Sequence, residues 1–219
     1  MKFRLNRIFY YLRAVFLILK EVPLGSWLDL LRRRVYLKRF GVRLGILSFL
    51  DLLVIKEVVA DDEYRIGGLV DKVDKIIVDI GAGLGDYAIL VAMRFPESVI
   101  YSFEPDINYF NLLRNNIVRN GAYNVVPINA AISSLNDLFT HTHTDIDVLK
   151  IDCEGCEFSI LNNMSIRYLK RVKKITMEYH KKFGDERGVI GMLKSSGFKI
   201  TQVLTDGVPE LGHIYAQRK

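Results

Sequence analysis

A glycine-rich segment follows an apolar run near the middle of the chain. The segment Asp79-Ile80-Gly81-Ala82-Gly83-Leu84-Gly85-Asp86 comes directly after Ile76-Ile77-Val78, and a helical pattern follows it. Glycines let the backbone pass close to a ligand, because no Cβ stands in the way. The spacing G-x-G-x-G differs from the G-x-G-x-x-G of dinucleotide sites, which disfavours a nicotinamide dehydrogenase. We therefore expect a turn that binds a different nucleotide-like cofactor.

Two carboxylates flank this loop in a regular register. Asp79 precedes the loop, where a carboxylate can hold the amino group of an amino-acid cofactor. Glu104 ends the next apolar run, nineteen residues past Gly85, where a carboxylate accepts hydrogen bonds from both hydroxyls of a ribose. A structural turn beside two surface acids is the alternative interpretation. Agreement of the loop and both acids in one register disfavours that alternative.

A second group of candidate residues follows two later apolar runs. Lys150, Asp152 and Glu154 stand at the end of the run that begins at Ile146, and His180 follows the run Lys174–Glu178. A hydroxyl that accepts a transferred group needs a base to take its proton. Asp152 and Glu154 supply carboxylates, Lys150 could neutralise one of them, and His180 could be the base. A structural histidine and a structural ion pair remain the alternatives for His180 and Lys150.

Regular alternation of strand-like and helix-like patterns must position these residues. From residue 75 onward, β-branched runs alternate with helical patterns, which is typical of a parallel sheet covered by helices on both faces. Ligands of such sheets bind at the carboxyl ends of the strands. We expect strands at 76–80, 99–104, 125–129, 146–151, 174–178, 198–203 and 213–216, and helices at 86–95, 108–120, from about 156, and 186–196.

The sequence contains few cysteines and histidines. Cys153 and Cys156 are the two cysteines, and this number predicts no disulfide framework and a reducing, cytoplasmic compartment. Their C-x-x-C spacing lies at a strand end, where cysteine packs as a small apolar side chain. His141 and His143 are expected in a loop with no further ligands, so we predict no metal site.

The N-terminal part of the chain is strongly basic. Residues 1–43 contain eleven Lys and Arg against two acids, a charge of +9, whereas the whole chain carries +6. The run Ile8–Leu19 is apolar except for Arg13, and twelve residues are too few to span a bilayer. We expect residues 1–60 to form a helical extension, broken near Pro23 and Gly41, with short strands at 52–55 and 58–59 before the body at 61–219. Contact with an anionic membrane, packing on the body or on a second copy, and a solvated face all stay open for residues 1–43.

Four segments of the chain resemble the FkbM family of S-adenosylmethionine (SAM)-dependent methyltransferases. They are Val78–Asp86, Ser102-Phe103-Glu104-Pro105, Asn129-Ala130-Ala131-Ile132, and Asp147–Glu157, which looks like the family's K-I-D-x-E-G-x-E signature. The resemblance covers about residues 50–205 and implies the Rossmann-like α/β fold of class I methyltransferases, with seven mostly parallel strands and the last one antiparallel. It implies that SAM is surrounded by Asp79, Gly81, Ala82, Gly83, Gly85, Asp86, Glu104, Pro105, Ala130 and Ala131.

The resemblance also implies a reaction class, O-methylation of a hydroxyl on a sugar, a glycan or a related small molecule. An RNA methyltransferase is one alternative, because of the basic N-terminal part. Base-methylating enzymes often have Asn/Asp-Pro-Pro-aromatic where this chain has Asp152-Cys153-Glu154-Gly155, so nucleic acid is the less favoured partner. A non-catalytic membrane-surface or assembly protein is the other alternative. A homodimer and a peripheral position at the inner membrane face stay open.

Overall fold

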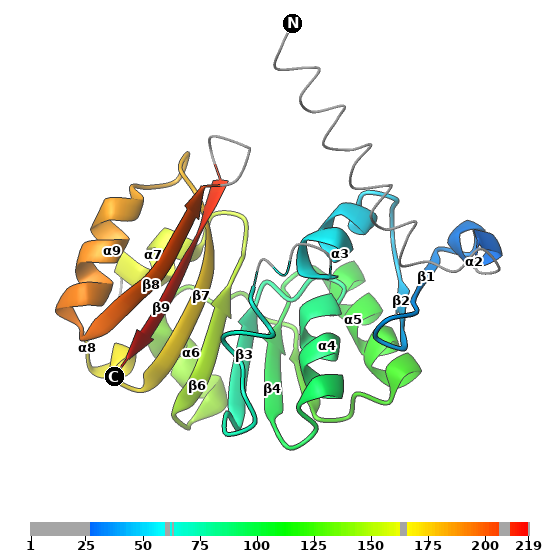
Figure 1. Cartoon of the computed structure of the whole chain (residues 1–219), viewed down its shortest axis with the longest axis horizontal. Helices are drawn as coiled ribbons and strands as arrows, with labels where there is room; N and C mark the ends of the chain where they lie inside the picture. The colour runs from blue at the N-terminus through cyan, green and yellow to red at the C-terminus, as the bar shows by residue number, and fades with distance from the viewer. Residues whose placement is uncertain (1–26, 60–61, 63, 163–165, 206–210, 219) are drawn as a thin grey trace, which may run out of the picture.

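A seven-stranded sheet forms the centre of the molecule (Figure 1). The computed structural model describes residues 27–59, 62, 64–162, 166–205 and 211–218. The strand order is β5-β4-β3-β6-β7-β9-β8, in which β3 to β7 are parallel and β9 is antiparallel to both neighbours. This is the expected class I methyltransferase sheet. The strands are β3 (Ile76–Ile80), β4 (Val99–Phe103), β5 (Val125–Ile128), β6 (Ile146–Ile151), β7 (Val172–His180), β8 (Phe198–Thr205) and β9 (Leu211–Arg218).

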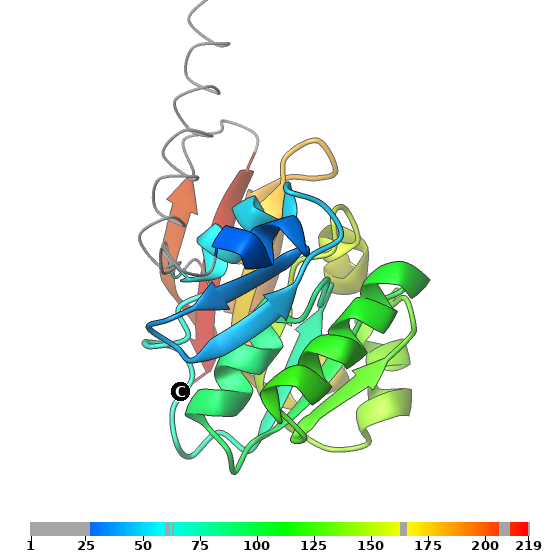
Figure 2. The ribbon, with the colours of Figure 1, turned by 90° about the vertical axis from the view of Figure 1, so that its right-hand side faces the viewer.

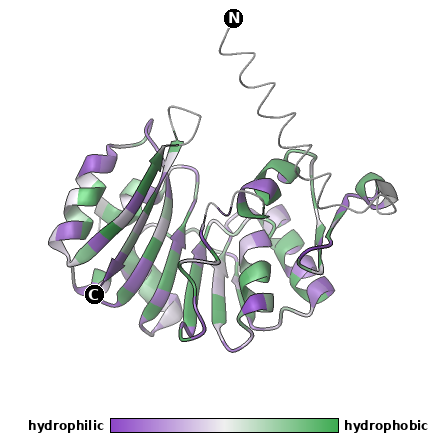
Figure 3. Cartoon of the chain, viewed as in Figure 1, coloured by the Kyte–Doolittle hydropathy of each residue, from purple (hydrophilic) through white to green (hydrophobic). Residues whose placement is uncertain are grey.

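Helices cover both faces of the sheet and create one apolar core on each side. The helices α4 (Asp86–Arg94) and α5 (Ile107–Asn120) pack against one face, and α6 (Leu135–Thr142), α7 (Glu157–Asn162), α8 (Ile166–Leu169) and α9 (Glu186–Ser195) against the other. Successive side chains of a strand point to opposite faces, so Ile77 packs in the first core while Val78 and Ile80 pack in the second. Figure 3 shows apolar stretches in the strands, and polar residues on the helices and on the strands toward β8.

Capping residues explain where the helices begin and end. Asp106 accepts hydrogen bonds from the amides of Asn108 and Tyr109 at the start of α5, and Gly121 ends this helix with a φ of 64°. The helix α6 was not expected. Ser134 accepts from the Asp137 amide at its start, and His143 ends it with a left-handed φ of 53°. The prediction of a loop around His141 and His143 is therefore wrong, because an N-capping serine precedes a helical apolar pattern.

The N-terminal prediction is also wrong for residues 34–45 and for the short strands expected at 52–55 and 58–59. A short helix α2 (Trp27–Leu31) leads into an antiparallel hairpin of β1 (Arg34–Leu37) and β2 (Val42–Gly45), not into further helices. Buried and exposed residues alternate along both strands, which is the period of a half-buried strand, and Gly41 supplies the positive φ of the turn. The expected short strands at 52–55 and 58–59 lie instead in the helix α3 (Asp51–Val59), which buries residues at helical spacing.

The hairpin and α3 join the core on the face that α4 and α5 cover, as Figure 2 shows from the side. Asn116 of α5 joins this hairpin to the glycine-rich loop. Its side chain accepts from the Gly45 amide at 2.7 Å and donates to the carbonyl oxygens of Gly45 and Leu84 at 3.2 and 2.9 Å. The predicted amphipathic helix at Ile8–Leu19 lies outside the described residues. Within the described ranges, no helix is long and apolar enough to cross a membrane.

Candidate functional site

A cavity of about 380 Å³ opens at the carboxyl ends of β3, β4 and β6. This is the edge at which sheets of this kind bind ligands, and the volume lies within the range of roughly 300–1,000 Å³ that is common for ligand pockets. The lining residues come from the glycine-rich loop, from the ends of three strands, from α5 and from α3. They are Asp51, Val54, Ile80, Gly81, Gly83, Leu84, Phe103, Glu104, Pro105, Tyr109, Ala130, Ala131, Ile132, Asp152, Cys153, Glu154 and Cys156.

Two glycines of the loop have different structural roles. Gly81 has a φ of 77°, and a Cβ built on it would lie 1.6 Å from the carbonyl oxygen of Asp152, so the loop packs directly on the end of β6. Gly83 has a φ of 52°, and a Cβ built there would meet no atom within 4 Å. The backbone at Gly83 therefore faces open space on the cavity wall, where a ligand can approach the loop closely.

Glu104 is held by the backbone at the edge of this cavity. Its Oε2 accepts from the Gly83 amide and its Oε1 from the Asp106 amide, both at 2.8 Å. Burial raises the pKa of this carboxyl, and the two amide hydrogen bonds oppose the rise. A carboxylate offers about four acceptor positions, so two remain for a ligand. This arrangement fits a group with two adjacent hydroxyls, as in a ribose.

The structure brings six of the ten predicted cofactor residues to the cavity wall. These six are Gly81, Gly83, Glu104, Pro105, Ala130 and Ala131. Ala82 and Gly85 stand behind the wall; a Cβ on Gly85 would lie 2.4 Å from the Leu113 side chain, so Gly85 allows α4 to pack on α5. Asp79 and Asp86 also do not line the cavity, and their surroundings explain why.

Asp79 forms a buried ion pair with Lys150. Lys150 Nζ lies 2.8 Å from Asp79 Oδ1, donates to the Gly81 carbonyl at 3.2 Å, and lies 3.7 Å from Asp152 Oδ2. Burial opposes the charge of Lys150, but Asp79 and Asp152 outweigh it and raise its pKa. The sequence predicted that Asp79 binds the cofactor and that Lys150 neutralises Asp152 or Glu154. The structure gives Lys150 its shortest contact with Asp79 and withdraws both side chains from the cavity wall.

Asp86 is buried at the first turn of α4. Its Oδ1 accepts from the Tyr87 amide at 3.0 Å, and no hydrogen-bond partner reaches its Oδ2 within the described part of the chain. Burial raises the pKa of Asp86 to about 7, against the attraction of Lys150. This carboxyl therefore titrates near neutral pH inside the protein, and it does not contact the cavity directly.

Asp152 is held by Tyr64, a residue that the sequence did not indicate. The Tyr64 hydroxyl donates to Asp152 Oδ2 at 2.6 Å and lies 3.2 Å from Glu178 Oε2, and Lys150 Nζ lies over the Tyr64 ring. Burial and the two carboxylates raise the pKa of Tyr64 well above its usual value, so it remains a donor. Tyr64 precedes β3 outside every motif, and only the tertiary fold brings it to this site.

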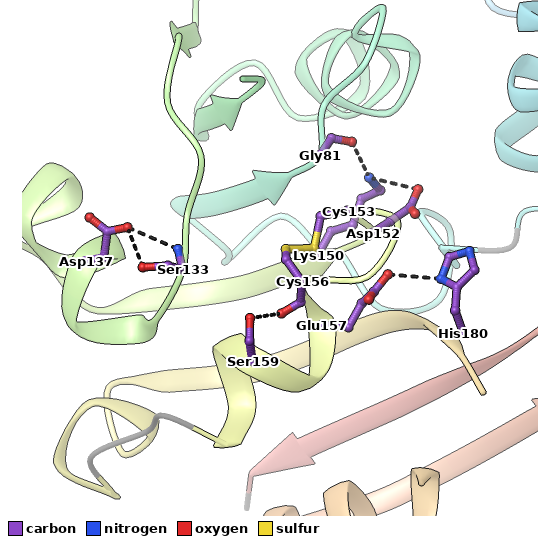
Figure 4. The surroundings of a disulfide bond; sticks show 10 residues. All are labelled: Gly81, Ser133, Asp137, Lys150, Asp152, Cys153, Cys156, Glu157, Ser159 and His180. Carbon is purple, nitrogen blue, oxygen red and sulfur yellow. Dashed lines mark hydrogen bonds and ion pairs between the residues drawn. A yellow bond between two sulfur atoms is a disulfide. The ribbon is translucent and has the colours of Figure 1, made fainter. Parts of the chain in front are cut away.

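His180 reaches the cavity only through Glu154. Its Nε2 lies 3.1 Å from Glu154 Oε2, and its Nδ1 lies 3.1 Å from Oε1 of the fully buried Glu157; Figure 4 shows the second contact. The His180 side chain is 8% exposed and does not line the cavity, whereas the Glu154 side chain is 80% exposed. The three side chains form one row that ends at the cavity, and Glu154 is its accessible end.

Cys153 and Cys156 are joined by a disulfide and both line the cavity (Figure 4). This corrects the expectation that the two side chains simply pack. The bond closes the turn that carries Glu154, which has a φ of 55°, and Gly155, which has a φ of 127°. A Cβ on Gly155 would lie 2.8 Å from the Phe183 ring, so this position also requires glycine. The tight turn aims the Glu154 carboxylate at His180.

Residues of the N-terminal part complete the cavity wall, which the sequence did not indicate. Asp51 and Val54 of α3 line it together with Tyr109 of α5. The Tyr109 hydroxyl donates to Asp51 Oδ1 at 2.9 Å, which joins α3 to α5 at the cavity. The two partners are 58 positions apart, so no local pattern predicts their contact.

Comparison with known proteins finds similar methyltransferases. Residues 118–214 match the family described as the methyltransferase FkbM domain. This match spans less than half of the chain. The match contains Lys150, Asp152, Glu154 and His180, and the glycine-rich loop and Glu104 precede it. Together with the class I fold, this match identifies a SAM-dependent methyltransferase.

Individual relatives of this methyltransferase are distant. The methyltransferase sdnD of Sordaria araneosa is 19% identical over 223 residues, covering 72% of this chain and 85% of the relative. Magnesium protoporphyrin IX methyltransferase of Synechocystis is 13% identical with a TM-score of 0.55, covering 80% of this chain and 86% of that chain. Precorrin-6y C5,15-methyltransferase of Geobacter metallireducens is 21% identical with a TM-score of 0.52, covering 70% and 84%. The two solved structures show the fold of the domain.

Proposed function

We propose that this methyltransferase transfers a methyl group from SAM to a hydroxyl group of a sugar, a glycan or a related small molecule. The observation that carries the proposal is the row Glu154, His180 and Glu157, which places an accessible carboxylate at the cavity with a buried histidine and a buried acid behind it. A hydroxyl acceptor loses a proton as it is methylated, so it needs such a base. The choice of a sugar or glycan rests on the resemblance to the FkbM family.

The residues at the glycine-rich loop fit SAM. SAM, when bound, supplies a methyl group on a positively charged sulfur that a nucleophilic oxygen can displace. Glu104 keeps two acceptor positions for ribose hydroxyls, Gly83 leaves the backbone open to the ligand, and Ala130 and Ala131 also line the cavity. The Synechocystis methyltransferase that shares this fold was solved with SAM bound, which supports the same use of the fold here.

The carboxylates at the other side of the cavity have different roles. Asp152 is engaged by the Tyr64 hydroxyl and lies near Lys150, so it is already partnered and holds the acceptor in position. Glu154 is the base that takes the hydroxyl proton. Its neighbour His180 orients it through Nε2 and is itself fixed by Glu157 at Nδ1. Lys150 keeps Asp79 and the Gly81 carbonyl in place and does not touch the acceptor.

Calorimetric titration with SAM, with its demethylated product and with NAD tests the cofactor assignment. We expect SAM and its product to bind and NAD not to bind. Glu104→Ala removes an acceptor shared by two hydroxyls and should weaken SAM binding by about 1.5–3 kcal/mol, the usual scale of hydrogen bonds to a charged group. Glu97→Ala is the matched control, because Glu97 is an exposed glutamate whose partner is Lys75, far from the loop. Unchanged SAM affinity in Glu104→Ala would refute the role of Glu104.

Incubation with methyl-labelled SAM and separated sugar, glycan and RNA fractions tests the acceptor. Label on a hydroxyl of a sugar or glycan is the expected result. Label on RNA would replace the proposed acceptor with nucleic acid. SAM binding without transfer to any fraction would favour the non-catalytic alternative.

A further inference from the structure

Large apolar side chains are exposed beside the cavity, next to a cluster of arginines. We name this surface the entrance face and define it by Leu31, Arg32, Arg34, Phe49, Leu50 and Val54. The apolar members are 78% (Leu31), 65% (Phe49), 68% (Leu50) and 43% (Val54) exposed, and both arginines are exposed. Exposed large apolar side chains that gather at one place mark a contact with a partner or a membrane.

Contacts within the structure join the entrance face to the cavity. The Arg33 carbonyl accepts from the Ile46 amide at 2.9 Å, and the Arg33 guanidinium donates to the Leu47 carbonyl at 2.8 Å, so the start of β1 lies beside the segment that leads to Phe49. Asp51 then accepts from the Leu47 amide at 2.7 Å, and Asp51 and Val54 line the cavity. A partner that covers the entrance face therefore lies next to the cavity.

Basic residues predominate around the entrance face. Residues 32–43 contain six Lys and Arg, all of them exposed, and no acid. Residues 1–26 contain five basic residues and one acid, so in charge they do not complement this face. The occupant that fits is an anionic one with an apolar interior, because it can pair with the arginines and also bury leucine, valine and phenylalanine side chains.

We propose that the entrance face docks on an anionic lipid bilayer, which presents an amphiphilic methyl acceptor to the cavity. Docking itself depends only on this surface, whereas the identity of the presented molecule rests on the proposed hydroxyl methylation. Single-stranded RNA would use aromatic side chains on which bases stack. Three of the four apolar members are aliphatic, which favours lipid over RNA.

Co-sedimentation of the full chain with vesicles tests this docking. We compare vesicles of pure phosphatidylcholine with vesicles that contain roughly one third phosphatidylserine, at low and high salt. Binding to the anionic vesicles alone, weakened by salt, is the expected result for the unchanged chain. Arg32→Gln with Arg34→Gln should weaken vesicle binding about thirtyfold, because each basic side chain near such a surface contributes roughly a factor of five.

The apolar part of the face is tested by Phe49→Ser with Leu50→Ser, which should weaken vesicle binding by about tenfold or more, since two apolar side chains lose their burial in lipid. Matched controls lie away from the entrance face. Val118→Ser with Tyr123→Ser changes two exposed apolar residues near the end of α5, and Lys170→Gln with Lys199→Gln removes two exposed charges from the other side of the sheet. These control variants should lose far less binding than the two entrance-face variants.

Three results would overturn the proposal: no binding to anionic vesicles at low salt, equal binding by the entrance-face variants and the unchanged chain, or binding to an RNA oligomer with no binding to vesicles. Calorimetry with SAM on the same samples, without vesicles, separates this failure from a failure of the proposed function. If the chain binds SAM and methylates a soluble acceptor but does not bind vesicles, the membrane docking is contradicted and the proposed function is not.

Discussion

Glu104 and Glu154 lie on opposite sides of one cavity and are held in opposite ways. Glu104 accepts hydrogen bonds from two backbone amides, those of Gly83 and Asp106, and these come from the turns that follow β3 and β4. Glu154 is largely exposed, and its ion-pair partner is the side chain of His180, which depends in turn on Glu157. The cofactor side is thus built mainly from backbone and the acceptor side mainly from side chains.

This difference predicts how each side of the site responds to a single substitution. A substitution on the backbone-built side should disrupt the fold, whereas one on the side-chain-built side should alter only the local site. Backbone positions are fixed by glycines, and at Gly81 and Gly85 a side chain would clash with neighbouring atoms. Side-chain positions can be altered singly while the fold survives. We therefore expect the largest losses of stability at the loop and the smallest at Glu154, with the buried charges between them.

Gly81→Ala is expected to have the largest effect. A Cβ at this position would lie 1.6 Å from the Asp152 carbonyl oxygen, and the φ of 77° is unfavourable for alanine. Because a backbone segment must move, the free energy of unfolding should fall by about 4 kcal/mol or more, or the chain should fail to fold. Urea denaturation measures this loss.

Gly191→Ala is the control for that substitution. Gly191 lies inside α9, and a Cβ built on it meets nothing within 4 Å. Alanine should stabilise the helix by about 0.5–1 kcal/mol at this position. A Gly81→Ala protein as stable as the unchanged chain would show that the loop does not pack on the end of β6.

Lys150→Met is expected to cause the next largest loss of stability. The change leaves Asp79 buried without its cation, and removing one partner of a buried pair typically costs about 3–5 kcal/mol. Adding Asp79→Asn should recover a large part of that loss, because the buried charge is then gone as well. Thermal and urea unfolding of the two single variants and the double variant measure this coupling. If the losses of stability in the double variant were simply additive, the ion pair between Asp79 and Lys150 would be contradicted.

Asp86→Asn is expected to change the pH dependence of stability. The folded protein holds the pKa of Asp86 at about 7, above the unfolded value, so the folded state keeps a proton that the unfolded state releases. Stability from this group is therefore present at pH below the unfolded pKa and is lost as the pH rises to about 7, at roughly 1 kcal/mol per pH unit.

The asparagine variant lacks that loss. Its free energy of unfolding should be close to that of the unchanged chain near pH 4 and higher than it at pH 8. Urea unfolding from pH 4 to 8 follows the difference between the two proteins. Parallel pH curves for both would contradict the raised pKa of Asp86.

Glu154→Gln is expected to change stability least and turnover most specifically. The Glu154 side chain is 80% exposed, so loss of its contact with His180 should cost under about 1 kcal/mol. Loss of a general base should lower kcat by about 10²–10⁴-fold while SAM affinity stays unchanged. His180→Gln should lower kcat less, because it only positions Glu154. An equal loss of SAM affinity and kcat would move Glu154 to the cofactor side.

The sequence alone determined most of the cofactor side. Apolar runs placed β6 at its observed bounds and the glycine-rich loop between β3 and α4, and Glu104 follows β4 at the cavity as expected. The two hydrogen bonds of Glu104 join residues 21 and 2 positions apart, and their donors are backbone amides. Glycine spacing and strand patterns in the sequence predict where such backbone groups lie. The expected parallel sheet with its antiparallel last strand is confirmed for the same reason.

Only the tertiary structure decided which charges meet. Asp79 and Lys150 are 71 positions apart, and Tyr64 and Asp152 are 88 apart, so nothing local could choose between a ligand and a buried partner for Asp79. The hairpin at 34–45 was missed because short alternating runs between arginines carry a weak signal, and its stability comes from packing on α5. Side chains distant in the chain find their partners through packing, which a sequence pattern does not describe.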